Sequence, residues 1–286
     1  MGIVFALTAL FAWGIGDFLI QRSARKFGDW AALFFIDIFG TIVLLPFVWQ
    51  DFPALFRSPE HLGILLTASI LLTFASVSEF EAMRVGKLSV IEPIYAAEVL
   101  VTVLLGTFIA REFLTIGQAV LVGLLVGSIF LVATKSLRHL RHIHAERGAG
   151  LALIAAIMMG GVNFLFGIGA RETSPLMINW FASAFIMLVS GAYLTARGRW
   201  HGVLADWRRS PGLILSVSFF DNLAWVAYSA ATLFLPIAIA TGISESYVAL
   251  AAMLGLAVNR EKLAGHQKIG LVVAVITVVI IASLYE

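Results

Sequence analysis

The chain has 286 residues, of which 60% are hydrophobic and 13% charged, and its formal net charge is +2. Soluble domains carry about 25% charged residues, so this composition excludes a soluble globular protein. The absence of cysteine excludes disulfides, thiolate nucleophiles and cysteine-bound metals. The small net charge, with basic residues confined to short connections, excludes a nucleic-acid partner.

Apolar runs follow one another along the chain, and each is long enough to cross a hydrocarbon core of about 30 Å as a helix. The strands of a membrane barrel would be about ten residues long and would alternate in polarity. The first run lacks a basic start and a small-residue cleavage site, so we interpret it as a span and not as a signal peptide. We predict an all-α integral membrane protein with ten transmembrane helices, at about 3–21, 30–49, 62–84, 88–109, 116–134, 149–168, 175–195, 213–233, 236–258 and 267–285.

The two halves of the sequence resemble each other. Asp17-Phe18-Leu19 matches Asn163-Phe164-Leu165 at an offset of 146, and REFLTIGQ (111–118) matches REKLAGHQ (260–267) at an offset of 149. Five spans in each half make the second half enter the membrane from the opposite side, which is an inverted repeat. Such repeats place a binding site near the midplane, between halves that give alternating access. We expect two five-helix repeats, over 1–134 and 149–286, joined by a basic linker over 135–148.

The basic residues are distributed unevenly between the two ends of the spans. Sixteen of the 19 lie in connections that follow odd-numbered spans, and only Arg57, Arg111 and Arg171 lie on the other side. The positive-inside rule then places the basic connections in the cytoplasm and both termini outside, in a multi-pass protein of the plasma (inner) membrane.

Eight acidic residues lie in or near the predicted spans, whereas almost no basic residue does. An ionisable residue in a span costs roughly 2.5–3.5 kcal/mol on insertion scales, so it usually faces a cavity or a partner. Glu81 can pair with Arg84 three residues later, and Glu92 can interact with the positive start of its helix. Asp37 fits a polar contact between helices as well as a site. The eight are Asp17, Asp37, Glu79, Glu81, Glu92, Glu98, Asp221 and Glu245.

Glu98 and Glu245 are the strongest candidates for a site. They occupy the fourth and ninth spans, which the repeat makes equivalent, and each follows a residue that can break a helix, Pro93 or Gly242. Broken helices in corresponding positions of two halves indicate a transporter site. The two glutamates do not superpose, because the offset aligns Glu98 with a tyrosine.

Aromatic residues accompany some of the acids. Asp221, Trp225 and Tyr228 follow one helix face, and Trp13 lies four residues before Asp17. An acid beside aromatic rings suits a cation, which gains charge pairing and attraction to the ring faces. The alternative is that these rings pack against neighbouring helices or lipid.

Four segments resemble the drug/metabolite transporter superfamily in its EamA-like family. They are EAMRVGKLSVIEPI (81–94), REFLTIGQ (111–118), AATLFLPIAIATGI (230–243) and REKLAGHQ (260–267). The resemblance covers the whole chain and implies a secondary carrier of small organic molecules with a central cavity. It leaves the substrate open, because the family moves amino acids, cations, nucleobases, sugars and other metabolites. It also implies cytoplasmic termini, opposite to the orientation that the loop charges predict.

These features predict a proton-coupled secondary transporter of a small cationic or amine-bearing metabolite. Low dielectric favours the protonated form of a carboxyl group, so one glutamate could exchange its proton for a cation. The alternative on the same fold is an exporter of neutral or aromatic amino acids. The predicted substrate-binding residues are Trp13, Tyr95, Glu98, Asn163, Asp221, Asn222, Trp225, Tyr228, Glu245 and Tyr247, and the predicted proton-coupling residues are Asp17, Glu79, Glu98 and Glu245.

Other function classes find no support in the sequence. It has no phosphate loop, no nucleophile–base pair and no convincing metal cluster, so we expect no enzyme activity, no cofactor and no metal. The expected partners are the substrate, protons and membrane lipid. The internal duplication supplies a complete cavity in one chain, so a monomer can function, and a dimer stays open as an alternative.

Overall fold

The computed structural model describes residues 1–55, 58–85, 93–134, 148–250 and 264–285. Within these ranges every regular element is a helix, and eight helices are long and apolar enough to cross a membrane. Two shorter apolar stretches, Pro93–Phe108 and Ile237–Leu250, bring the described spans to the predicted ten. The elements are α1 (Gly2–Phe27), α2 (Asp29–Val48), η1 (Trp49–Asp51), α3 (Phe52–Leu55), α4 (Pro59–Val85), α6 (Ala97–Phe108), α7 (Ile116–Ala133), α8 (Ala149–Glu172), α9 (Pro175–Ala196), α10 (Trp200–Arg209), α11 (Pro211–Ala231), α12 (Ile237–Ser244) and α14 (Gly265–Leu284).

Local signals in the sequence set several of these helix ends. Gly28 separates α1 from α2 with φ 83, a backbone angle that glycine adopts without steric cost. Ser174 caps α9 by accepting the Met177 N–H at 3.0 Å, and Pro175 follows at the first helical position. Most predicted spans therefore agree with the helices to within a few residues, although α1 continues six residues past its predicted end.

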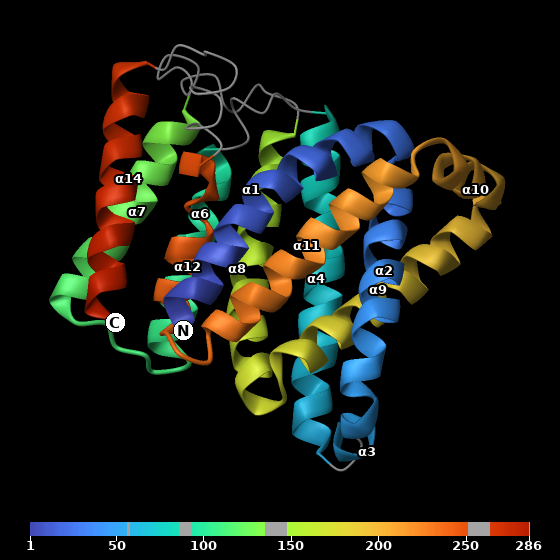
Figure 1. Cartoon of the computed structure of the whole chain (residues 1–286), viewed down its shortest axis with the longest axis horizontal. Helices are drawn as coiled ribbons and strands as arrows, with labels where there is room; N and C mark the ends of the chain where they lie inside the picture. The colour runs from blue at the N-terminus through green and yellow to red at the C-terminus, as the bar shows by residue number, and fades with distance from the viewer. Residues whose placement is uncertain (56–57, 86–92, 135–147, 251–263, 286) are drawn as a thin grey trace.

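The helices pack as two related sets. α1 lies along α11 and α8 lies along α4, while α2 packs on α9 and α7 packs on α14. The contact of α1 with α11 is thus equivalent to the contact of α8 with α4. The other two contacts each join a helix to its own equivalent in the other half. In Figure 1, α1 and α8 run in opposite directions, as do α2 and α9, so the repeat is inverted as predicted.

Close contacts fix the register of the repeat. Gly14 on α1 lies against Leu250, and Gly160 on α8 lies against Val101. The glycines are 146 residues apart and their partners 149, which are the two offsets seen in the sequence.

A pair of arginines repeats the same register. Arg25 donates to the Met83 carbonyl at 3.4 Å, and Arg171 donates to the Thr232 carbonyl at 2.8 Å. These four residues keep the two offsets as well, so helix equivalence extends to individual contacts.

The fourth and ninth spans are both interrupted. In the first half a turn at Ala96 separates residues 93–95 from α6, and in the second half a turn over 245–246 follows α12. The predicted break at Gly242 is therefore wrong in position, because Gly242 is helical and Glu245 itself lies in the turn. Residues 86–92 and 251–263, with Glu92 among them, lie outside the described ranges.

α10 corrects a second expectation. It lies in residues 196–212, between the predicted spans 175–195 and 213–233, where the polar sequence predicted only a connection. Its apolar residues recur at spacings of three and four, which builds one apolar face among the arginines. Trp200 packs edge-on against Phe34 with ring centroids 5.0 Å apart, Trp207 lies beside Phe35, and Val203 is buried. α10 therefore covers the end of α2.

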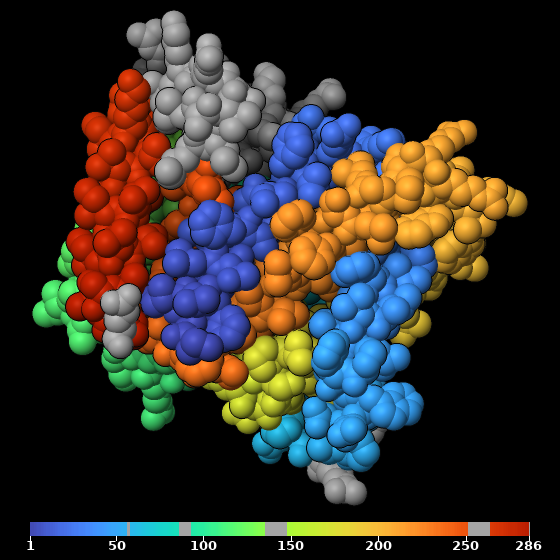
Figure 2. Space-filling view, viewed as in Figure 1, coloured from blue at the N-terminus to red at the C-terminus, as the bar shows by residue number. Residues whose placement is uncertain are grey.

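The two ends of the bundle differ. Both chain termini lie at one end, and α10 and the turn between α1 and α2 lie at the other (Figure 1). The space-filling view shows α1 and α11 side by side across the face toward the viewer (Figure 2). We call the two ends the termini end and the basic end, because the basic last turns of α1 and α10 lie at the second.

Candidate functional site

A cavity lies between the two repeats. Its walls come from α1, α2, α4, α8, α9 and α11 and from the two interrupted spans, and its empty volume, including the part open to the outside, is ≈ 860 Å³. The predicted binding residues that line it are Trp13, Tyr95, Glu98, Asn163, Asp221, Asn222, Trp225, Glu245 and Tyr247, and Asp17 and Glu79 line it too.

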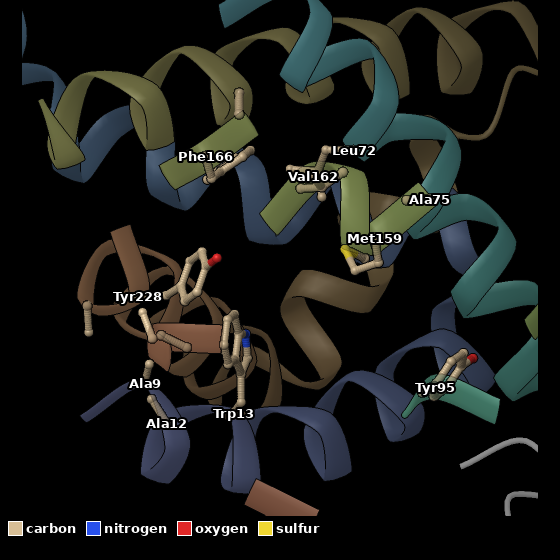
Figure 3. Packing of buried hydrophobic residues seen from close by; sticks show 14 of the residues in the cluster. Ala9, Ala12, Trp13, Leu72, Ala75, Tyr95, Met159, Val162, Phe166 and Tyr228 are labelled. Carbon is tan, nitrogen blue, oxygen red and sulfur yellow. The ribbon is translucent and has the colours of Figure 1, made fainter. Parts of the chain in front are cut away.

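Tyr228 is the predicted binding residue that lies outside this cavity lining. Its side chain is fully buried, and its hydroxyl contacts the Asn163 carbonyl and the Thr241 hydroxyl, each at 2.9 Å. Its ring lies beside Trp13 and Trp225 (Figure 3). Tyr228 thus supports the aromatic wall from behind.

Six carboxyl groups line the cavity, whereas its described lining includes no lysine, arginine or histidine. They come from α1, α2, α4, α6 and α11 and from the turn after α12. Two of them, Asp37 and Glu98, are 6% and 7% exposed, so the protein holds these groups largely away from water. The six are Asp17, Asp37, Glu79, Glu98, Asp221 and Glu245.

Glu98 and Glu245 form a hydrogen-bonded carboxyl pair. Their side chains contact each other, and the Asn163 amide donates to Glu98 Oε1 at 3.2 Å. Since an ionised carboxylate only accepts hydrogen bonds, two carboxyl groups can bond to each other only when one holds a proton. This pair therefore carries at most one negative charge in the arrangement observed.

The repeat register explains how the pair forms. Glu98 lies in the first turn of α6, near the positive end of the helix dipole. Glu245 aligns with Ala96, two residues before Glu98, and lies in the turn that ends α12. Two neighbouring but non-equivalent positions thus bring the carboxyl groups together beside the two-fold axis.

A related contact occurs at the equivalent positions of the other repeat. Asp17 aligns with Asn163, and Tyr247 aligns with Glu98. The Tyr247 side chain donates to the Asp17 carboxylate. Both contacts join one repeat to the other, and they are equivalent except that donor and acceptor are exchanged.

No carboxyl residue of the cavity aligns with a carboxyl residue of the other repeat. Each of the six carboxyl residues aligns with a neutral residue of the other repeat, so the acidic set is asymmetric although the backbone is two-fold. The aligned pairs are Asp17 and Asn163, Asp37 and Ser183, Glu79 and Tyr228, Glu98 and Tyr247, Asp221 and Leu72, and Glu245 and Ala96.

A second acidic pair lies where α2, α9 and α11 meet. Asp37 lies beside Asp221 and is hydrogen-bonded to Ser183. Asn222 holds this junction by donating to the Ile36 carbonyl at 3.0 Å. The sequence left Asp37 between a packing role and a site role, and its place in the cavity brings it into the acidic set.

Ser183 and Asn179 of α9 also line the cavity, and neither was anticipated. A signal for Ser183 existed, because the 146-residue offset aligns it with Asp37. Asn179 had no such signal, since its equivalent is Leu33.

Aromatic rings form one wall of the cavity. Trp13 meets Trp225 edge-on with centroids 5.2 Å apart, and Phe166 packs on Trp225 at 4.7 Å. Figure 3 shows Trp13 facing the ribbon of α8, and Tyr95, which belongs to the interrupted fourth span, near the far end of the α1 segment in view. The ring surfaces that border the cavity attract a cation that lies against them.

Ion pairs lie outside the cavity at both ends of the bundle. At the termini end Arg171 pairs with Glu112, whose second oxygen accepts the Ile237 N–H at 2.8 Å. At the basic end the predicted Glu81–Arg84 pair is confirmed.

Comparison with known proteins identifies the family. The sequence profile of the EamA-like transporter family matches residues 1–134 and 146–283. The chain belongs to the EamA-like transporter family. As an EamA-like protein it is a membrane transporter of the drug/metabolite transporter superfamily, as the sequence resemblance implied.

Other comparisons concern the fold of this EamA-like protein. A search of curated proteins found no match. A solved structure, described only as a crystal structure of a protein, superposes with a TM-score of 0.71 over 99% of this chain and 97% of its own. The two sequences are 13% identical, so this likeness supports the fold and says nothing about the substrate.

Proposed function

We propose that this EamA-like protein is a secondary transporter that exchanges protons for a small organic cation by alternating access. The observation that carries the proposal is the cavity lining, which combines six carboxyl groups with aromatic rings and has no basic side chain among its described residues. A cation entering this cavity replaces protons as the partner of the carboxylates.

The alternative substrate, a neutral amino acid, fits this lining less well. Its carboxylate would enter a cavity in which six carboxyl groups already lie and in which no described lining side chain is basic. A like charge placed among them is disfavoured, whereas an amine is attracted. The acidic lining therefore supports the cation over the amino acid.

The Glu98–Glu245 pair supports competition between proton and substrate. When a monovalent cation binds, the carboxyl proton that joins the pair leaves to the aqueous side to which the cavity is open. One positive charge then replaces another, so the exchange is electroneutral. Proton and cation cannot both neutralise the same carboxylate, and this exclusion couples their movements.

We further propose that residues 1–134 and 149–286 are the two moving repeats, with 135–148 as the linker between them. The protein then lies in the cell membrane with its basic connections in the cytoplasm, where the positive-inside rule places them. A single chain contains the whole cavity lining, which supports a functional monomer.

Proton release on cation uptake tests the proposal. The purified protein is reconstituted into liposomes that contain a pH-sensitive dye, and butylguanidinium, which stays charged at all working pH values, is added outside. We expect alkalinisation of the lumen in the wild type, and none in Glu98→Gln or Glu245→Gln. Glu172→Gln, which changes an exposed acid outside the cavity, serves as the active control. Uptake without proton movement would contradict the coupling.

Binding measurements separate the two substrate classes. Thermal unfolding in detergent is recorded with organic cations and with neutral amino acids at pH 6 and pH 8. A ligand specific for the folded state adds about 2.7 kcal/mol of stability at a hundredfold excess over Kd. We expect stabilisation by cations that weakens at pH 6. Stabilisation by neutral amino acids alone would replace the proposal with its alternative.

A further inference from the structure

One polar atom of the cavity wall has no partner. Asn163 is 1% exposed, and its side-chain oxygen Oδ1 is buried without a hydrogen bond among the described residues. Buried polar atoms are nearly always paired, because leaving one unpaired costs the free energy of desolvating it. An unpaired acceptor on a residue of the cavity wall therefore points to a donor on the ligand, which pairs with it by displacing the groups that cover this oxygen.

The orientation of this amide is fixed by its neighbours. Its Nδ2 group donates to Glu98 Oε1 at 3.2 Å and also contacts Glu245. An ionised carboxylate oxygen accepts only, so it selects the NH₂ side of the amide and leaves Oδ1 free. The backbone of Asn163 is held as well, because its carbonyl accepts the Tyr228 hydroxyl at 2.9 Å.

The equivalent residue of the other repeat has a partner for its side-chain oxygens. Asp17 aligns with Asn163, and its carboxylate accepts from Tyr247. The unpaired acceptor is therefore confined to the α8 side of the cavity, next to the Glu98–Glu245 pair. Oδ1 belongs to the same amide whose Nδ2 donates to Glu98, so it lies next to this pair.

From this arrangement we infer that the substrate binds through a charged nitrogen that carries N–H, as in a protonated amine or a guanidinium. Asn163 Oδ1 accepts this N–H. Quaternary ammonium ions have no N–H to donate and are selected against. The inference rests on the proposed cation transport and names its substrate class. Charge pairing and the aromatic rings attract both kinds of cation. Only a nitrogen that carries N–H can donate to Oδ1.

A series of N-methylated ligands tests the inference on the unmodified protein. The probes are benzylammonium, N,N-dimethylbenzylammonium and benzyltrimethylammonium, which share one ring and one charge at pH 7 and differ in their N–H count. We expect affinity to fall at least tenfold at the last methyl group, which removes the last donor. A fall per added methyl group that is as large between the first two probes as between the last two would show that size decides, and would overturn the inference.

Substitution of Asn163 supplies the second arm. Asn163→Leu keeps a similar volume and removes the acceptor, whereas Asn163→Asp keeps an acceptor and reproduces the residue of the other repeat. The readout is the ratio of benzylammonium to benzyltrimethylammonium affinity, because loss of the contact to Glu98 affects both ligands. We expect a ratio near one in Asn163→Leu and a retained preference in Asn163→Asp.

The outcomes separate this inference from the proposed function. If both cations bind equally well to the wild type, or if the preference survives in Asn163→Leu, the role of Oδ1 is wrong and cation transport still stands. If neither cation binds at any pH while neutral amino acids do, the proposed function itself fails. Should Asn163→Leu fail to fold, the methyl series on the wild type decides alone.

Discussion

Gly40 controls the geometry of the second acidic pair. A Cβ atom at this position would lie 2.1 Å from Asn222 Oδ1 and 2.6 Å from Ser183 Oγ. Both side chains line the cavity beside Asp37. The absence of a side chain at Gly40 therefore allows α2 to approach α9 and α11 closely enough for these polar groups to meet.

Replacing Gly40 tests this close approach. We expect Gly40→Ala to lower the free energy of unfolding by about 1–3 kcal/mol, because added atoms in a packed site force neighbours to move. It should also weaken cation binding, since Asn222 is displaced. Thermal unfolding with and without ligand measures both effects.

Gly123 in α7 provides the matched control, because a Cβ there would meet nothing within 4 Å. Gly123→Ala should leave binding unchanged and add about 0.5–1 kcal/mol of stability, the ordinary gain of alanine over glycine in a helix. Similar losses in both variants would show that glycine flexibility, and not the close approach, matters at Gly40.

At the level of elements, one carboxylate joins three segments at the termini end. Glu112 precedes α7, pairs with Arg171 at the end of α8, and accepts the first N–H of α12 at Ile237. Arg171 also donates to the Leu235 carbonyl at 3.0 Å. These bonds satisfy backbone groups that a helix terminus would otherwise leave unpaired, and they join the two repeats below the cavity.

Removing the charge of Glu112 should loosen this junction. We expect Glu112→Gln to lower the free energy of unfolding by about 1.5–3 kcal/mol, the range for hydrogen bonds to charged groups. Glu172→Gln is the control, because Glu172 is exposed and pairs with His61 at 3.5 Å, a surface pair that contributes little. Equal effects of the two substitutions would contradict a junction role for Glu112.

The whole molecule has a chemically asymmetric cavity in a two-fold scaffold. Both termini lie at one end, and the basic last turns of α1 and α10 lie at the other (Figure 1). The charge count places the basic end in the cytoplasm, whereas resemblance to the family implies cytoplasmic termini. The two predictions thus insert the same structure into the membrane in opposite orientations.

Cysteine labelling decides the orientation, and the chain has no cysteine of its own to interfere. Glu172→Cys lies at the termini end and Gly202→Cys lies on α10 at the basic end, and both positions are exposed. In intact cells a membrane-impermeant maleimide should label Glu172→Cys and should reach Gly202→Cys only after permeabilisation. The reverse pattern would place the termini in the cytoplasm.

Much of this architecture was predictable from the sequence. Spans were predictable because crossing a bilayer requires long apolar runs, and each run is encoded locally. The offsets of 146 and 149 also predicted which helices are equivalent, and contacts such as Gly14 with Leu250 follow that register. α10 was missed because arginines surround its apolar residues.

The sequence by itself determined the class of protein, its inverted duplication and the excess of acids within its spans. Only the tertiary structure decided which acids meet: Glu98 contacts Glu245, Asp37 lies near Asp221, and Tyr228 packs behind the aromatic wall. The physical reason is that hydropathy is a property of each segment, whereas the meeting of two side chains depends on how closely helices approach. That approach is set by individual small residues such as Gly40 and by the turn at Glu245, and a linear pattern does not show it.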